Sequence, residues 1–270
     1  MIGLVLGDTH IGELIVKKLK SLKINFIIID ISKRKLFKKN KKSYQLSIGQ
    51  LGKCISILKS NRCKKLIFAG RVDRPNFSNT KFDFKAIYHL PKIIKETKKG
   101  DAYIIKFITN LFIKEGFKII SQTFFNTELV LRKGNHTKTK PNIENKTDII
   151  IGKKIINNLK NKNVSQGIVV IKKKVIISED FKGTDAMLTK AQKIVKKIYS
   201  RKKRSGILLK LPKPNQDMRT DLPTVGLKTI KKCVKIGLRG IVVKSKYNIF
   251  IDKSKCINLA NKNNIFIYAI

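Results

Sequence analysis

Acidic residues are scarce in this chain of 270 residues, which has 17 Asp and Glu against 61 Lys and Arg and a formal net charge of +44. Histidine, cysteine and tryptophan are also rare, with three, four and no residues respectively. The four cysteines form no C-x-x-C pair, and the histidines are far apart in the sequence. Because a structural zinc site needs closely spaced Cys or His ligands, we expect no zinc site and expect reduced, buried cysteines.

Long apolar runs are absent too. No run approaches the roughly 18 residues of a membrane-spanning helix, and the N-terminus lacks the basic segment that opens a signal peptide. We therefore expect a cytoplasmic protein. Hydrophobic residues make up 42% of the chain, enough for a packed core, and the length suits one large domain or two of about 100–150 residues.

The positive charge points first to nucleic acid, because Lys and Arg that neutralise phosphates bind polyanions without sequence preference. However, lysines are spread over nearly every expected helix and most turns, and they accompany Ile and Asn, which AT-rich codons also favour. We therefore expect no specific nucleic-acid partner. A non-enzymatic, basic nucleic-acid-binding protein stays the alternative function, and peripheral contact with an anionic inner-membrane surface stays a hypothesis.

Strand-like and helix-like patterns alternate in the first part of the chain. The expected strands are 3–6, 25–29 and 65–69, and the expected helices are 11–22, 50–60, 82–96 and 101–115. This alternation predicts a doubly wound parallel sheet. We assign residues 1–131 to an N-terminal Rossmann-like domain.

A polar stretch with one proline, residues 132–142, is the predicted linker. Residues 143–270 then form a distinct C-terminal catalytic α/β domain. Its expected helices are 148–159, 184–199 and 226–236, and its expected strands are 167–171, 175–178, 206–211, 240–243, 246–251 and 264–270. The fold class predicted for the whole chain is α/β in two domains.

The segment Gly7-Asp8-Thr9-His10 ends the first expected strand and has three interpretations. The first interpretation is a metallophosphoesterase motif. The chain has too few metal ligands for it, because three histidines cannot complete a two-metal centre. As a Rossmann glycine loop it lacks the G-x-G-x-x-G spacing, although Asp30 ends the second strand where a ribose-binding acid would stand. The third interpretation is a tight strand-to-helix turn and a structural aspartate, with a helix N-terminus open to an anion.

Two arginines, Arg71 and Arg74, directly follow the third buried strand in a chain that overwhelmingly uses lysine. Ligands of doubly wound sheets bind outside the carboxyl ends of the strands, and the planar guanidinium suits phosphate. The alternative is an internal ion pair with Asp73. Both interpretations stay open.

The densest group of polar side chains lies between residues 210 and 223, where prolines stiffen the chain. Asp217 and Asp221 offer hard oxygen ligands, and Lys213 and Arg219 offer positive charge for phosphate. Oxygen ligands without His or Cys favour Mg²⁺, with Mn²⁺ as the alternative, over zinc.

Gly183-Thr184-Asp185 opens an expected helix whose N–H groups suit an anion, although plain capping explains the same residues. Five of the 17 acidic residues fall within 179–221, more than an even spread would place there. Glu179 and Asp185 are therefore further candidates for a metal site.

Together, these segments resemble the UDP-2,3-diacylglucosamine pyrophosphatases of lipid A synthesis, of the LpxI type. The matching stretches occur in family order and are FAGRVDRPNF at 68–77, KGD at 99–101, EGF at 115–117, SQGIVV at 165–170, GTDAML at 183–188 and KPNQDMRTDLPTVG at 213–226. Two positions depart from the family pattern. Asp8-Thr9-His10 replaces most of a glycine-rich turn, and Lys182 replaces a carboxylate.

The resemblance implies Mg²⁺-dependent hydrolysis of UDP-2,3-diacylglucosamine to UMP and 2,3-diacylglucosamine 1-phosphate (lipid X), with Asp221 as the aspartate needed for activity. We predict Asp221 and Asp217 as catalytic residues. The predicted metal ligands are Asp221, Asp185 and Glu179. The predicted substrate-binding residues are Arg71, Arg74, Gly183, Thr184, Lys213, Gln216 and Arg219. A module that binds a UDP-sugar without cleaving it is a further alternative.

Overall fold

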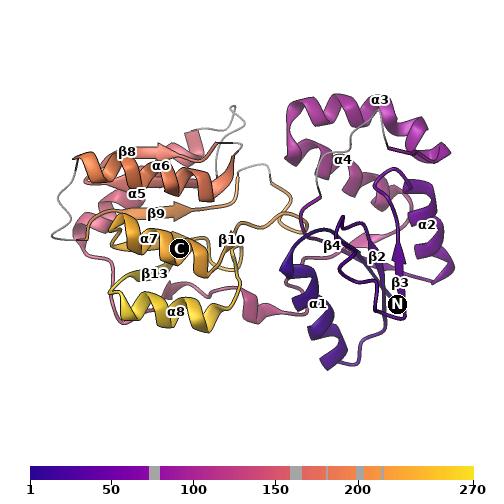
Figure 1. Cartoon of the computed structure of the whole chain (residues 1–270), viewed down its shortest axis with the longest axis horizontal. Coiled ribbons are helices and arrows are strands. Elements are labelled where there is room, and N and C mark those ends of the chain that lie inside the picture. The colour runs from indigo at the N-terminus through magenta and orange to yellow at the C-terminus, as the bar shows by residue number, and fades with distance from the viewer. Residues whose placement is uncertain (73–79, 159–165, 181, 199–203, 214–215) are drawn as a thin grey trace. The chain divides into compact units, whose positions relative to one another are not determined.

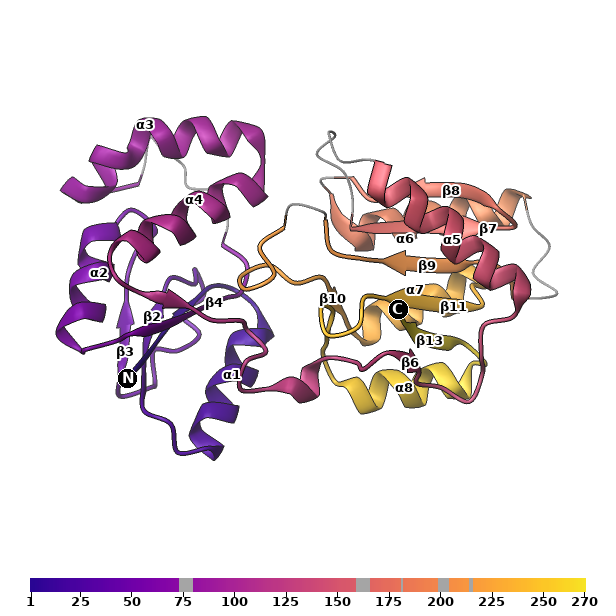
Figure 2. The ribbon, with the colours of Figure 1, turned by 180° about the vertical axis from the view of Figure 1, so that it is seen from behind.

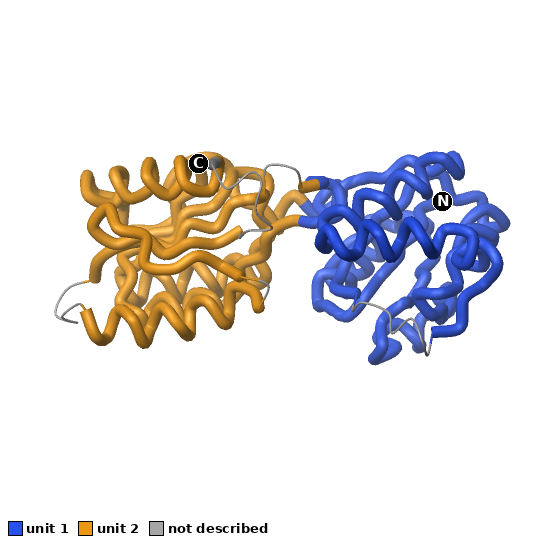
Figure 3. Tube along the Cα trace, turned by 90° about the horizontal axis from the view of Figure 1, so that it is seen from above, with its two compact units in different colours: residues 1–126, 217–221 blue, residues 127–216, 222–270 orange. Residues whose placement is uncertain are grey.

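The computed structural model describes residues 1–72, 80–158, 166–180, 182–198, 204–213 and 216–270. They form two compact units (Figure 3). One comprises Met1–Asn126 and Asp217–Asp221, and the other Thr127–Gln216 and Leu222–Ile270. Each unit has its own sheet and helices (Figure 1), so the predicted two-domain α/β fold is confirmed.

The first unit is built on a five-stranded sheet in the order β3-β2-β1-β4-β5, in which every neighbouring pair runs parallel. The strands are β1 (Ile2–Leu6), β2 (Phe26–Asp30), β3 (Ser43–Gln45), β4 (Lys65–Ala69) and β5 (Lys118–Ile119). Leu6 lies opposite both Asp30 and Ala69, so the three central strands end level with one another. The strand order reverses between β1 and β4, and the carboxyl ends of these strands are where such sheets bind ligands.

Helices cover both faces of this sheet, which explains the continuous apolar runs of its strands. They are α1 (His10–Ser21), α2 (Leu51–Ser60), α3 (Phe84–Lys99) and α4 (Asp101–Lys114). On one face, Leu58 of α2 and Phe112 of α4 join Val5 in one buried cluster. On the other face, Gly12 of α1 approaches the side chain of Leu6. The predicted doubly wound arrangement is therefore present.

The second unit has a mixed six-stranded sheet in the order β6-β13-β11-β9-β7-β8. Its strands are β6 (Gly134–Asn135), β7 (Gly167–Ile171), β8 (Lys174–Ser178), β9 (Ile207–Lys210), β11 (Gly240–Val243) and β13 (Phe266–Ala269). The three strands β9, β11 and β13 run parallel. Strand β6 pairs antiparallel with β13, β7 with β9, and β8 with β7. A separate parallel pair consists of β10 (Thr224–Val225) and β12 (Ile249–Phe250).

Helices cover both faces of this second sheet (Figures 1 and 2). They are α6 (Gly183–Ile198), α7 (Leu227–Ile236) and α8 (Lys253–Lys262) on the first face and α5 (Ile143–Asn158) on the second. A 3-10 turn, η1 (Thr127–Leu129), opens the unit. Leu208 of β9 packs in the cluster of α6 to α8, whereas its neighbour Leu209 packs in the cluster of α5. This alternation is the period of a strand that is buried on both faces.

Several elements have the bounds that the sequence predicts, and others differ. The segment predicted as a linker, 132–142, contains β6, and the backbone N–H of His136 donates to the carbonyl of Ile267 in β13 (2.9 Å). This polar segment is therefore part of the second unit's sheet. The strand expected at 246–251 is only two residues long and pairs with β10, outside the main sheet.

The four cysteines are buried free thiols, as expected. Burial raises the pKa of Cys54 and of Cys233 to about 12, so these thiols stay protonated at neutral pH. None of the helices that the structure describes combines the length and the apolar character needed to cross a bilayer.

Candidate functional site

Where the strand order reverses, the loops that follow β1 and β4 are in close backbone contact. Gly7 N–H donates to the carbonyl of Ala69 (2.9 Å), and Asp8 N–H donates to that of Arg71 (2.7 Å). A Cβ at Gly7 would lie 2.3 Å from the Arg71 carbonyl oxygen. Gly70 has φ +94°, and its Cβ would lie within 2.9 Å of the Gly7 backbone. Glycine at both positions therefore lets the loops after β1 and β4 meet, which places Asp8 beside the backbone of Arg71.

This close approach predicts a large cost for Gly70→Ala. The substitution combines a positive φ with a clash against backbone, so we expect it to lower the free energy of unfolding by about 2–4 kcal/mol. Gly116 is a matched control, because it has φ +92° with no atom within 4 Å of an added Cβ. Gly116→Ala should cost only about 1 kcal/mol. Urea unfolding of both variants measures the difference, and equal costs would show that the loops relax without loss.

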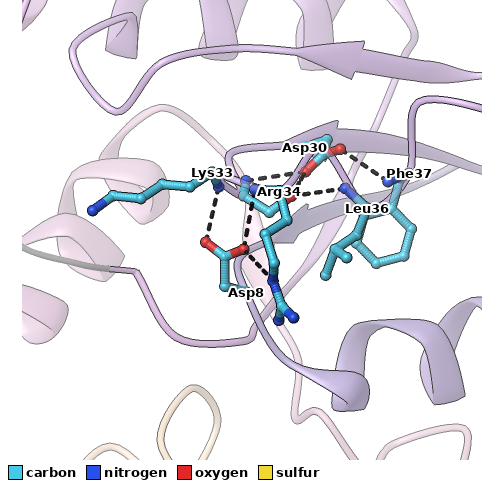
Figure 4. A network of polar contacts seen from close by, with 7 residues as sticks. Asp8, Asp30, Lys33, Arg34, Leu36 and Phe37 are labelled. Carbon is cyan, nitrogen blue, oxygen red and sulfur yellow. Dashed lines mark hydrogen bonds and ion pairs between the residues drawn. The ribbon is translucent and has the colours of Figure 1, made fainter.

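Two aspartates at this edge bind the loop that follows β2 (Figure 4). Asp8 accepts hydrogen bonds from Lys33 N–H (2.8 Å) and from the backbone and Nε of Arg34 (both 3.3 Å). The bond from the Lys33 N–H, followed by those from Arg34, holds the pKa of Asp8 below its usual value. Asp8 is therefore a loop-fixing carboxylate, and Arg34 lies next to it.

Asp30 is almost fully buried at the end of β2. Its Oδ1 accepts from the Ser32 backbone N–H (3.0 Å) and hydroxyl (2.6 Å), and its Oδ2 accepts from Phe37 N–H (3.0 Å). Both carboxylate oxygens are thus occupied by the following loop (Figure 4). The structural interpretation of Asp30 fits these contacts better than a ribose-binding role.

The segment Asp217–Asp221, from the proline-rich stretch of the sequence, is part of the first unit. Gln122, buried after β5, holds it there. Its Nε2 donates to the carbonyl of Thr220 (2.6 Å) and to that of Phe68 in β4 (3.0 Å), and its backbone N–H donates to the carbonyl of Arg219 (3.3 Å). The loop therefore lies at the carboxyl end of the parallel sheet. Gln122 is a site residue that the sequence patterns did not predict, since its sequence signal is only an amide two residues after the apolar pair Ile119-Ile120.

Within this loop, Asp217 and Arg219 form a bidentate ion pair. Arg219 Nε lies 2.9 Å from Asp217 Oδ1, and its terminal nitrogen lies 2.7 Å from Oδ2. The hydrogen bond from Arg219 lowers the pKa of Asp217, and the same bond raises the pKa of Arg219. Both oxygens of Asp217 therefore orient Arg219. Asp221 is half-buried, and its N–H donates to the carbonyl of Asp217 (3.0 Å), which closes the turn.

A second polar group lies in the second unit, around the end of β9. Lys210 is only 6% exposed, and its Nζ donates to the Thr184 hydroxyl (2.8 Å) and to the Thr224 carbonyl (2.7 Å). The Thr184 hydroxyl in turn donates to Glu179 Oε1 (3.0 Å). Glu179 Oε2 is buried and has no hydrogen-bond partner among the described residues. Lys210 is thus a second residue that the sequence analysis left outside the site, because it reads as the last position of a strand.

Asp185 faces α7 rather than Glu179 or Thr184. Its carboxylate lies 2.6 Å from Lys228 Nζ and 3.5 Å from Lys232 Nζ. Burial alone would raise the pKa of Asp185, but the hydrogen bond from Lys228 and the charge of Lys232 bring it below its usual value. These ion pairs tie α6 to α7.

Gln216 forms two hydrogen bonds with the backbone of Lys213. Its side-chain oxygen accepts from Lys213 N–H (2.9 Å), and its own N–H donates to the Lys213 carbonyl (3.1 Å). Gln216 is buried, and these bonds hold it beside Lys213, next to Asp217 in the chain.

The predicted site residues thus fall into two groups, each within one unit. The first unit contains Arg71, Asp217, Arg219 and Asp221, and the second contains Glu179, Gly183, Thr184, Asp185, Lys213 and Gln216. Arg74 lies outside the described residues. In the described part of the chain, no three His, Cys, Asp or Glu side chains gather as a metal-binding group.

Sequence comparisons cover nearly the whole chain. Residues 1–129 match the LpxI N-terminal domain, and residues 132–268 match the LpxI C-terminal domain. The chain is also 33% identical, over 226 residues, to a protein of Caulobacter vibrioides named UDP-2,3-diacylglucosamine pyrophosphatase LpxI. That alignment covers 83% of this chain and 81% of the relative.

Proposed function

The chain belongs to the LpxI family, and from this membership we propose that it hydrolyses the pyrophosphate bond of UDP-2,3-diacylglucosamine in lipid A synthesis. The products would be UMP and 2,3-diacylglucosamine 1-phosphate. The observation that carries the proposal is the match of both family domains, in order, together with the name of the Caulobacter relative.

The chemistry of the first unit supports a diphosphate as the reacting group. Arg71 and Arg34 lie on the loops at the carboxyl edge of the sheet. Arg219 lies on the segment that Gln122 binds at that edge, and Asp217 orients its guanidinium. Guanidinium groups bind phosphate oxygens with two parallel hydrogen bonds. Hydrolysis of a phosphoanhydride needs little covalent help, so positioning and charge stabilisation would supply most of the rate. Arg74, Gly183, Thr184, Lys213 and Gln216 remain predicted substrate contacts.

The metal we propose is Mg²⁺, with Mn²⁺ as the alternative, and Asp221 as its main protein ligand. Mg²⁺ is usually held by one or two carboxylates plus substrate phosphates rather than by a cage of protein ligands. One carboxylate and a diphosphate therefore make a suitable donor set without a preformed acidic cluster. A bound Mg²⁺ would neutralise charge on the phosphates. Asp221 would hold it and, through its remaining oxygen, orient water.

The other predicted ligands differ in how well they suit a metal. Arg219 occupies both oxygens of Asp217, and two lysines neutralise Asp185, so both carboxylates fit structural roles better. Glu179 fits better, because one of its oxygens is buried without a partner among the described residues. We retain Glu179 as a separate candidate within the second unit.

Removal of divalent metal should stop the reaction. Purified protein incubated with UDP-2,3-diacylglucosamine and Mg²⁺ should release UMP, detected by chromatography, and excess EDTA should reduce the rate by at least about a hundredfold. Adding Mg²⁺ back should restore it. Unchanged turnover in EDTA would contradict only the proposed role of the metal and not the proposed reaction. Tight binding of the substrate with no UMP release would instead support a binding module.

We also propose that the protein works in the cytoplasm, in peripheral contact with the anionic membrane surface and without a specific nucleic-acid partner. The diacylated substrate and the net charge of +44 support this proposal. Binding of mixed-sequence DNA at physiological salt, compared with vesicle binding, tests the preference for lipid.

A further inference from the structure

The outer face of α3 exposes an apolar surface. Phe84 is 86% exposed, Tyr88 76% and Ile87 54%, and Pro91 continues the same face one turn later. These positions follow the i, i+3, i+4, i+7 spacing of one helix side. The opposite side of α3 packs on α4 (Figures 1 and 2). A helix at the surface of a globular protein normally turns this outward side polar.

Lysines continue this face toward the end of the helix. Lys92, Lys95, Lys98 and Lys99 are exposed there. Two nearby acids are neutralised, since Glu96 pairs with Lys99 (2.8 Å) and Glu115 pairs with Lys59 (2.6 Å) and with Lys85. We call residues 84, 87, 88, 91, 92, 95, 98 and 99 the α3 face. Its first half is apolar and its second half is positively charged.

This combination fits an anionic lipid surface better than a second copy of the chain. Helices that lie in a membrane interface bury aromatic and aliphatic side chains among the headgroups while lysines contact anionic lipids. Two copies meeting through this face would bring together two chains of net charge +44, and their charges repel. A lipid surface instead supplies both the apolar layer and the opposite charge.

We propose that the α3 face docks the protein on anionic bilayers. The residues Phe84, Ile87 and Tyr88 would enter the headgroup layer, and the lysines of the last two turns would contact anionic headgroups. The inference rests on the membrane contact of the proposed function and names the surface that makes it. It does not depend on catalysis, although a diacylated substrate would be met at such a surface.

Tryptophan fluorescence tests the apolar half, because the chain has no tryptophan. In Phe84→Trp, the new indole would be the single reporter at a site where an exposed aromatic ring already stands. Vesicles of equal parts phosphatidylcholine and phosphatidylglycerol should shift its emission to the blue, and brominated acyl chains should quench it. Ile143→Trp on α5 is the matched control, since Ile143 is 83% exposed. Its emission should stay unchanged under the same conditions.

Paired lysine substitutions test the charged half against the general effect of net charge. Lys92→Gln with Lys95→Gln should weaken vesicle binding in sedimentation, by about fivefold for each lysine. The control is Lys193→Gln with Lys196→Gln on α6, which removes the same charge at the same spacing from exposed positions. The control pair should change binding by less than about twofold, an estimate that follows from the short range of surface charge.

Three results would overturn the proposal. The emission of the Phe84→Trp protein could stay unchanged on vesicles that bind it, the two lysine pairs could lose equal affinity, or the emission could change with protein concentration in the absence of lipid. The last result would indicate contact between copies. Activity is measured separately on a short-chain, water-soluble substrate, on which all these variants should keep UMP release. If the unsubstituted protein released no UMP from this substrate, the proposed function would be contradicted and the docking result would still stand.

Discussion

Asp221→Asn should lower the kcat for UMP release by about a thousandfold or more. The substitution keeps the size of the side chain but removes the negative charge that would hold Mg²⁺ and orient water. It leaves the hydrogen bond from the Asp221 N–H to the Asp217 carbonyl intact, because that bond belongs to the backbone. The turn should therefore survive, and the midpoint of thermal unfolding should change little. Single-turnover release of UMP, followed by chromatography, measures the effect.

The control for this variant is Asp252→Asn in the second unit. Asp252 is an exposed carboxylate that forms one long ion pair with Lys255 (3.8 Å), and its φ of +54° suits asparagine. This variant should keep turnover within about twofold, as surface substitutions normally do. Near-normal turnover in Asp221→Asn would remove Asp221 from the mechanism, whatever the outcome of the EDTA experiment.

Gln122→Ala should produce the second largest loss, a decrease in kcat of about 10- to 100-fold. Gln122 is a positioning residue, because it holds the backbone of Thr220 and Arg219 at the sheet edge and does not itself carry the reacting group. Without the side-chain amide, the bonds to the Thr220 and Phe68 carbonyls are lost and only the backbone bond from residue 122 to the Arg219 carbonyl remains, so the loop that carries Asp221 is held less firmly. The buried carbonyl of Thr220 and the partly buried carbonyl of Phe68 also lose a donor, which should cost about 1–3 kcal/mol of the free energy of unfolding.

An isosteric variant separates positioning from simple loss of packing. Gln122→Glu keeps the volume of the side chain, but a carboxylate cannot donate to the carbonyls of Thr220 and Phe68. It should therefore be as impaired in kcat as Gln122→Ala, with a smaller change in KM. Gln45→Ala, at an exposed position of β3, should behave as the unsubstituted protein. A Gln122→Glu enzyme with normal kcat would show that these hydrogen bonds do not position the loop.

Local patterns predicted most of the fold. The apolar runs at 65–69, 167–171 and 240–243 became β4, β7 and β11 with the expected bounds, because a strand buried on both faces is apolar throughout. The polar side chains of 132–142 predict a linker. Its pairing with β13 uses backbone groups, and side-chain patterns do not report those.

The candidate site was only partly predictable for the same reason. The sequence predicts Asp217, Arg219 and Asp221 as site residues, since acidic and basic side chains cluster there between prolines. It assigned them to the second domain, whereas the contact between Gln122 and Thr220 joins residues 98 positions apart and brings the segment into the first unit. No periodicity connects positions so distant. Asp185 also looked like a metal ligand by its place at a helix start, and its ion pairs with α7 are equally invisible in the sequence.

The membership of Asp217–Asp221 in the first unit has a consequence for how this gene can be divided. Splitting the coding sequence at codon 126 would give two polypeptides. The first would lack the backbone that Gln122 binds, and the second would carry that backbone away from its partner. Recombination that exchanged one domain for another would separate the same contacts. The two domains are therefore expected to be inherited as a single cistron, and exchange of either one alone should be selected against.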